Sequence, residues 1–141
     1  MPEKKTIQRA RKDAHEGKAP STQAGEFVRE EMEHIRQGKH GARSTKQAIA
    51  IGLSKARRAG VKLAPPKKGR TSAATRKKAE RDYQRGQSHS ASKPSPKRSA
   101  ARKKALKREG HSAASKASLS KHARQAARNR KRRGKVTSSA R

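Results

Sequence analysis

Large apolar side chains are too scarce in this chain of 141 residues to build a core of ordinary size. Apart from alanine, fifteen residues are apolar and bulky, and eleven of them fall within residues 1–63. Lys and Arg number 41 against 10 Asp and Glu, which gives a net charge of +31. Such a chain buries too little apolar surface to offset the entropy of folding. We therefore expect much of it to be disordered, and we expect no compact enzyme domain.

Charge and apolar content divide the chain into two unequal parts. Residues 1–63 carry 15 cationic and seven acidic side chains, whereas residues 64–141 carry 26 cationic and three acidic ones. Pro65 and Pro66 cannot continue a helix and lie where the composition changes. We expect an N-terminal helical module over 1–63, a Pro/Lys linker over 64–71 and a basic tail rich in Ala, Ser, Lys and Arg over 72–141.

The best helix signal lies between residues 22 and 37. Its apolar residues recur at the spacing of one helix face, namely Ala24, Phe27, Val28, Met32 and Ile35. Ser21 or Thr22 is the expected N-cap, and Gly38 is the expected stop.

A second helix is indicated between Ser44 and Gly60. Ser44 and Gln47 have the spacing of a capping box, in which each side chain satisfies a backbone amide of the other residue. Gly60 and Val61 have the pattern of a Schellman stop. The two helices form a predicted helical hairpin, and residues 4–16 are a possible third helix.

The tail contains three weaker helix signals, over residues 73–85, 100–109 and 113–133. Each has a serine before it and a glycine after it, but almost no apolar face. Short helices without a face to bury are marginal in water, and lysines four residues apart repel each other. The predicted fold class is mostly α, a small helical hairpin followed by a largely disordered basic tail with marginal helices.

Cation density is the strongest functional signal. Each Lys or Arg that meets a phosphate releases condensed counterions, so such a chain is expected to bind nucleic acid in a salt-dependent way. Aromatic residues that could stack on unpaired bases are limited to Phe27 and Tyr83, which favours duplex DNA over single strands. The predicted contacts are Lys46, Lys55, Arg57, Arg58, Lys67, Lys68, Arg70, Lys97, Arg98, Arg102, Lys103, Lys104, Arg128, Arg130, Lys131, Arg132, Arg133 and Lys135.

The apolar faces of the hairpin are a possible surface for self-association or for a partner. The residues of this face are Phe27, Val28, Met32, Ile35, Ile49 and Leu53. We keep a homodimer through this face as an open hypothesis.

The acidic side chains gather in the first hairpin helix, at Glu26, Glu30, Glu31 and Glu33. One interpretation is a solvated face on which Arg29 pairs with Glu33 four residues on. The other is a docking surface for the protein's own tail or for a neighbouring copy. No nucleophile, base or paired carboxylate in a pocket is indicated, so we expect no enzyme.

No metal ion and no cofactor is expected. The histidines His15, His34, His40, His89, His111 and His122 show no zinc-site spacing, and the chain has no cysteine. His34 and His40, the nearest pair, lie across a predicted loop. The histidines are expected to add titratable charge near phosphate.

Pro94 to Arg98 read Pro-Ser-Pro-Lys-Arg. This run resembles the Ser-Pro-basic element of linker-histone tails, which enters narrow A·T-rich minor grooves. An ordinary Ser-Pro linker is the alternative interpretation.

Residues 19–31 (APSTQAGEFVREE) and 38–60 (GKHGARSTKQAIAIGLSKARRAG) carry a family resemblance. They resemble the signature of small, very basic bacterial proteins, a family of unknown function whose members are often labelled DNA-binding. The tail is similar in composition to the Ala/Lys-rich tails of histone-like proteins. The resemblance implies a bacterial setting and a DNA-related role, and it implies no mapped residues.

These patterns predict a non-enzymatic, histone-like, nucleoid-associated protein that binds duplex DNA with low sequence specificity. RNA or ribosome association is one alternative, and a protein-interaction module with a polycationic tail is another. No apolar run is long enough for a signal peptide or a membrane span. The expected location is therefore the cytoplasm, at the nucleoid.

Overall fold

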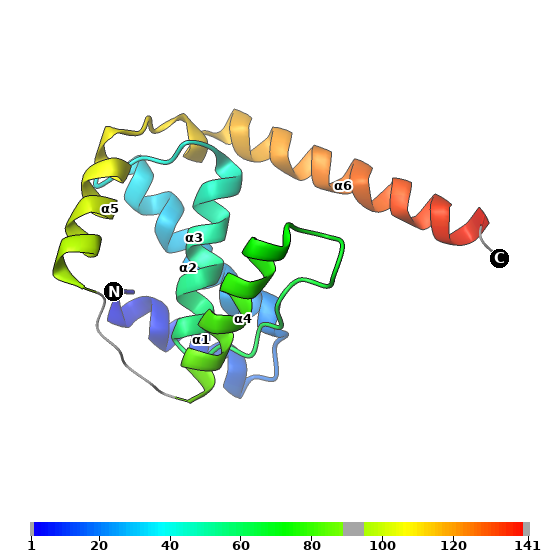
Figure 1. Cartoon of the computed structure of the whole chain (residues 1–141), viewed down its shortest axis with the longest axis horizontal. Coiled ribbons are helices and arrows are strands. Elements are labelled where there is room, and N and C mark those ends of the chain that lie inside the picture. Colours follow the sequence, from blue (N-terminus) through cyan, green and yellow to red (C-terminus); the bar gives the residue numbers. More distant parts are fainter. Residues whose placement is uncertain (1, 89–94, 140–141) are drawn as a thin grey trace.

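The computed structural model describes residues 2–88 and 95–139, with side chains up to Gly134. All regular secondary structure in these residues is helical (Figure 1). The elements in chain order are α1 (Lys4–His15), α2 (Pro20–Arg36), α3 (Thr45–Arg58), α4 (Ala73–Gln87), α5 (Pro96–Arg108), the 3₁₀ turn η1 (Ser112–Ala114) and α6 (Lys116–Ser139). None of the described helices is long and apolar enough to cross a membrane.

Helices α1, α2 and α3 pack around small apolar clusters, as their sequence patterns predict. Phe27 is 1% exposed and packs with Ala10, Ala24 and Ala56 in one cluster. The other cluster has Ile35 of α2, fully buried, at its centre. Helices α2 and α3 approach closely at Gly52, which has no side chain. A Cβ added there would lie 2.7 Å from Val28 Cα.

The predicted ends of these helices are largely confirmed. The Ser44 hydroxyl accepts the Gln47 N–H at 3.1 Å, although the Gln47 side chain accepts from the Arg43 N–H, not from that of Ser44. Gly38 and Gly60 have φ values of 76° and 101°, and the amide two residues past each C-cap completes a Schellman bond. Helix α2 begins earlier than predicted: Ala19, and not Ser21 or Thr22, is the N-cap, and Pro20 takes the first helical position.

The expectation of a largely disordered tail is wrong. Residues 106–114 are tied to the loop between α2 and α3, mainly by backbone groups. The Gly41 N–H donates to the Leu106 carbonyl at 2.8 Å, and the Ala42 N–H donates to that of Gly110 at 3.0 Å. The Thr45 hydroxyl donates to the Ala113 carbonyl at 2.6 Å, and Ala113 and Ala114 are buried in the cluster around Ile35.

Helix α4 packs against α3. Gly86 lies so close to the Arg57 carbonyl oxygen that no side chain fits between them. The Gln87 side chain donates to the Gly60 carbonyl at 3.1 Å, and the Ser54 hydroxyl donates to Asp82 at 2.6 Å. These contacts cross the linker expected at residues 64–71, and the division into 1–63, 64–71 and 72–141 stays a prediction.

All three tail helices differ from their expected bounds. Helix α4 continues through Gly86, the expected stop, to Gln87. Helix α5 begins at Pro96, with Ser95 as the N-cap, and not near residue 100. Helix α6 runs through Gly134, the expected stop. A single glycine inside a helix costs only about 1 kcal/mol, so the helix can continue past it.

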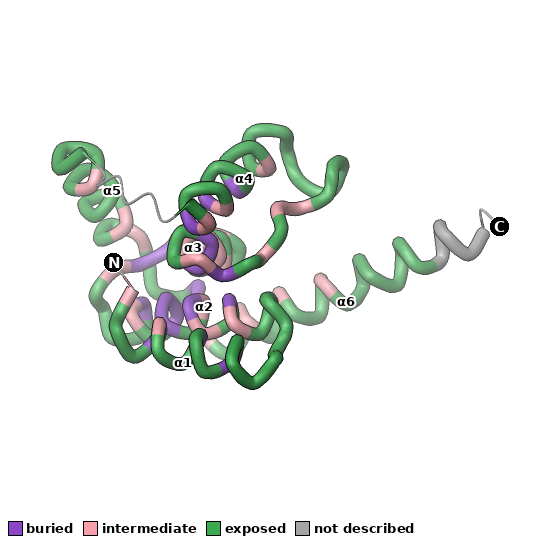
Figure 2. The backbone as a smooth tube through the Cα atoms, turned by 90° about the horizontal axis from the view of Figure 1, so that it is seen from below, coloured by how far each residue is buried: buried purple, intermediate pink, exposed green. Residues whose placement is uncertain are grey.

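Burial is concentrated in α2 and α3, whereas α5 and α6 are almost entirely exposed (Figure 2). Helix α5 buries none of its residues. Helix α6 extends from the body of the molecule, attached at its first turns near η1 and α3 (Figure 1). The fold thus presents two basic helices on a small helical body.

Candidate nucleic-acid interface

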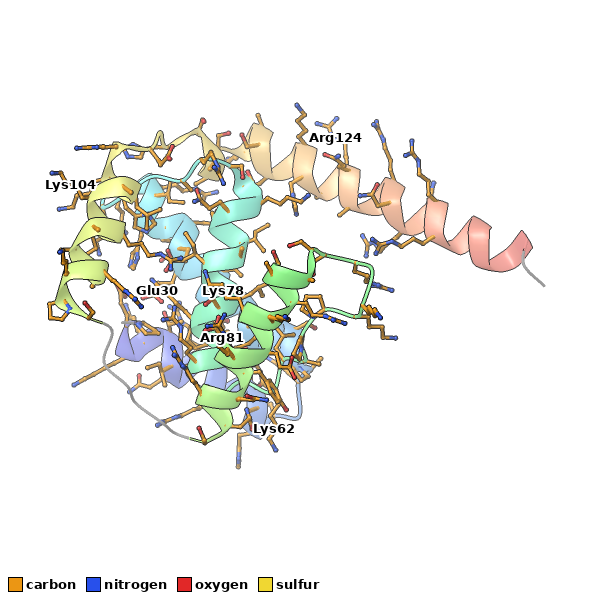
Figure 3. The ribbon with its side chains drawn as sticks, in the orientation of Figure 1. Glu30, Lys62, Lys78, Arg81, Lys104 and Arg124 are labelled. Carbon is orange, nitrogen blue, oxygen red and sulfur yellow. The ribbon has the colours of Figure 1, made fainter. Side chains whose placement is uncertain are left out.

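A groove of about 320 Å³ is lined by residues of α3, α4 and α5. It collects six cationic side chains that are far apart in the sequence. The lining residues are Ser54 and Arg58 from α3, Lys78, Arg81, Asp82 and Arg85 from α4, and Arg98 and Arg102 from α5. Lys78 and Arg81 are labelled in Figure 3.

Asp82 is the acidic residue of this groove, and it is already engaged. Its carboxylate accepts the Ser54 hydroxyl proton at 2.6 Å and lies 3.8 Å from Arg58 Nε. Asp82 is buried, 7% exposed, on the face of α4 that contacts α3. The remaining cations of the groove therefore make its surface strongly positive.

A second basic surface follows one face of α6. It is a shallow depression of about 450 Å³ lined by Lys121, Arg124, Gln125, Arg128, Asn129 and Arg132. Their spacing of three and four residues places them on one side of the helix. Arg124 points away from the body of the molecule (Figure 3).

Helices α5 and α6 contain no acidic residue. In the described residues, Lys121, Arg124 and Arg128 have no carboxylate partner among the ion pairs of the structure. The charge of these three side chains is therefore not balanced by a carboxylate of the described residues.

Most of the other predicted contact residues are exposed. Lys67, Lys68 and Arg70 lie on the loop before α4, and Lys46 lies in the first turn of α3. Lys97, Lys103 and Lys104 project from α5 outside the groove, and Arg130, Lys131, Arg132 and Arg133 project from α6. The side chain of Lys135 lies outside the described part of the chain.

Lys55 and Arg57 are exceptions, because the protein itself uses their charges. Lys55 Nζ is ion-paired with Glu31, a carboxylate only 1% exposed. Arg57 is 7% exposed, and its guanidinium donates to the carbonyls of Leu63 and Ala64, both at 3.2 Å. Burial lowers the pKa of Arg57, while Asp82 opposes that effect. We leave both residues out of the proposed interface.

The apolar face considered for self-association is partly covered within the chain. Phe27, Met32 and Ile35 are buried, and Val28, Ile49 and Leu53 pack against the two clusters. Half of this face is therefore closed to a partner, while Val28, Ile49 and Leu53 stay partly exposed.

The interpretation of the acidic residues as a solvated face is wrong for Glu30 and Glu31. These carboxylates are buried, 4% and 0% exposed, and they pair with residues from other parts of the chain. Glu30 accepts the Glu3 N–H at 2.7 Å. The predicted pair of Arg29 with Glu33 is present at 3.4 Å, and Glu26 lies 4.0 Å from Arg9.

The structure brings His34 and His40 together across the loop that separates them. Their ring centroids are 6.1 Å apart. His34 Nε2 lies 3.1 Å from a carboxylate oxygen of Glu3, and this hydrogen bond is the main cause that lowers the pKa of Glu3. The spacing Glu31-x-x-His34, which places both side chains on one helix face, is the sequence signal for this cluster.

The other histidines lie apart from this cluster. His15 and His111 are exposed, His122 is half-buried on α6, and His89 lies outside the described residues. Of the Pro-Ser-Pro-Lys-Arg run, Pro94 also lies outside them. Ser95 caps α5 by accepting the Arg98 N–H at 3.5 Å, so the described part of this run is a helix start.

The comparisons with known proteins reach only the N-terminal part of this arrangement. No curated protein and no solved structure matches the chain. Residues 4–68, which include α1, α2 and α3, match the model of a family described as a family of unknown function, DUF6496.

Proposed function

We propose that this chain is a non-enzymatic, nucleoid-associated protein of a bacterium that binds duplex DNA through phosphates with low sequence specificity. The observation that carries the proposal is the acid-free pair of helices α5 and α6, presented on a folded body. Lys and Arg side chains held along a helix neutralise phosphates without any need to read bases.

The dimensions of α6 support a duplex ligand. Its 24 residues give a length of about 36 Å, close to one turn of B-form DNA. Cations four residues apart lie about 6 Å apart along the helix axis, which allows successive contacts with one phosphate backbone. The groove between α3, α4 and α5 offers further phosphate contacts.

Single-stranded RNA or DNA is less well matched by the chain. Base stacking needs exposed aromatic rings. Phe27 is buried and Tyr83 is half-buried. A phosphate-dominated mode on a duplex is therefore favoured over a stacking mode.

Fluorescence anisotropy with the full-length protein tests the proposal. Two unrelated DNA duplexes, an RNA duplex and a single strand are compared from 50 to 200 mM KCl. We expect the DNA duplexes to bind equally and most tightly, with affinity falling about 10³-fold or more over this range. Tighter binding to RNA, or binding that does not respond to salt, would contradict the proposal.

A pair of double variants tests the groove. Arg98→Gln/Arg102→Gln removes two lining cations from α5, and the control Lys4→Gln/Lys5→Gln removes the same charge from α1, outside the groove. We expect the first variant to reduce the slope of log affinity against log salt by about 2. Equal reductions in both variants would remove the groove from the interface.

A further inference from the structure

A polar cluster formed by α2 and the loop after it points to a second kind of site. Glu31, His34 and His40 each bring one potential ligand atom to within 4.8 Å of the others. The two imidazole rings stand at 80° to each other. We propose that these three residues bind a divalent transition-metal ion, for which Zn²⁺ fits best because its common ligands include imidazole nitrogen and carboxylate oxygen.

Glu31 is the residue that most needs a further cation. Its side chain is 1% exposed, and one oxygen accepts from the Lys55 ammonium. The other oxygen, Oε2, is buried and makes no hydrogen bond, although His40 Nε2 lies 3.1 Å from it. A buried carboxylate oxygen without a donor destabilises the fold, and a metal ion at Oε2 would relieve that penalty.

His40 is oriented as a metal ligand usually is. Its Nδ1 lies 2.9 Å from the Gly41 carbonyl oxygen, which can only accept, so Nδ1 carries the proton. Its other nitrogen, Nε2, faces Glu31 Oε2 at 3.1 Å, a contact that needs either a proton or a cation between the two atoms. This separation is close to that of neighbouring ligands of tetrahedral Zn²⁺, about 3.4 Å. A backbone carbonyl that fixes the tautomer is a typical outer partner of a ligating histidine.

His34 completes the set from the same helix face as Glu31. The Glu-x-x-His spacing of these two residues is the one that metal-binding helical bundles use. His34 is held by Glu3, at 3.1 Å from Nε2, and it also lies 3.8 Å from Glu30.

The local charge favours a cation although the whole protein is strongly basic. The carboxylates of Glu3, Glu30 and Glu31 outnumber the ammonium groups of Lys39 and Lys55 that pair with them. The ion would add positive charge where the protein has a local deficit.

The position of His40 gives the ion a structural consequence. The next residues in the loop, Gly41 and Ala42, hold Leu106 and Gly110 by backbone hydrogen bonds. A metal ion that joins His40 to α2 would fix this loop, and with it the docking of the segment between α5 and α6. Metal binding should therefore raise the thermal stability of the protein.

Zinc titration of the full-length protein, purified without a histidine tag and stripped with a chelator, tests the proposal. We expect one Zn²⁺ per chain in competition with a chromophoric chelator of micromolar affinity, together with a rise in Tm. Co²⁺ in its place should give the visible absorption of a four-coordinate ion. Failure to take up Zn²⁺ against the chelator would overturn the proposal.

Single variants test which residues bind the ion. His34→Gln and His40→Gln should each weaken Zn²⁺ binding by more than about 100-fold, whereas His111→Gln, at an exposed histidine, should leave it unchanged. Both test variants leave the buried pair of Glu31 with Lys55 in place. Unchanged Zn²⁺ affinity in both would overturn the site. So would an NMR titration that shows His40 doubly protonated against Glu31, with no metal uptake.

Discussion

Helices α2 and α6 have the same secondary structure and opposite surroundings. Helix α2 buries Phe27, Met32 and Ile35, and its carboxylates at Glu30 and Glu31 find partners inside the protein. Helix α6 contains no acidic residue, and its side chains from Ala127 to Gly134 are all exposed. The carboxylates of α2 thus pair mainly within the packed helices, whereas Lys121, Arg124 and Arg128 on the projecting helix have no carboxylate partner among the described residues.

Truncation of an apolar residue in each helix should show the largest difference between them. Phe27→Ala removes a fully buried ring from α2 and should lower the free energy of unfolding by about 3–5 kcal/mol. Leu119→Ala removes a half-buried side chain from α6 and should cost less than about 2 kcal/mol. Urea unfolding followed by circular dichroism measures both. Equal losses would show that α6 is as tightly packed as α2.

A methyl group added at Gly41 should loosen the docked tail, whereas one added on α2 should not. Its Cβ would overlap the backbone of Glu109 and Gly110, so Gly41→Ala should cost about 1–3 kcal/mol and loosen α5 and α6. Gly25→Ala is the matched control on α2, where no atom lies within 4 Å of the added Cβ. The control should be neutral or stabilising by up to about 1 kcal/mol. Hydrogen exchange would show faster exchange in residues 96–114 in the first variant, and unchanged rates there would contradict the docking described above.

Removal of a helix cap should have a smaller effect, expressed differently in the two regions. Ser44 caps α3 and Ser115 caps the start of α6, where it accepts the Ser118 N–H at 3.2 Å. Ser44→Ala should lower global stability by about 1 kcal/mol. Ser115→Ala should instead reduce helix content near residue 116 with little change in the unfolding midpoint, because α6 contributes few buried contacts. The opposite pattern would place the cooperative core in α6.

The fold of residues 4–60 could be predicted because its determinants are local. Apolar residues recur at helical spacing around Phe27 and Ile35, and Ser44, Gly38 and Gly60 mark helix ends. Each signal lies within one turn of the structure it specifies, so the sequence alone is sufficient.

The docking of the tail could not be predicted, because backbone groups and small side chains carry it. Ala113 and Ala114 fill a cluster without any bulky apolar residue, and the hydrogen bonds of Gly41 and Ala42 use main-chain atoms. A search for large apolar residues overlooks both. The burial of Glu31 was missed for a related reason, since Lys55 and His40 lie 24 and nine residues away in the sequence.

The density of charge in the sequence predicts the candidate interface only in part. The density of Lys and Arg identified α5 and α6, but it could not separate Arg58, which lines the groove, from Arg57 beside it, which caps carbonyls of the loop after α3. The two residues lie on different faces of α3, and which face packs against the loop depends on the tertiary structure.

The salt dependence of duplex binding tests the central claim most directly. Lys121→Gln/Arg124→Gln/Arg128→Gln/Arg132→Gln neutralises one face of α6, and the control Lys4→Gln/Lys5→Gln/Arg11→Gln/Lys12→Gln removes the same charge from α1. We predict that the α6 variant lowers the slope of log affinity against log salt by about 3–4, with unchanged thermal stability, and that the control lowers it by less than about 1. Equal slopes in the two variants, or an α6 variant that binds duplex DNA like the native protein, would contradict the account.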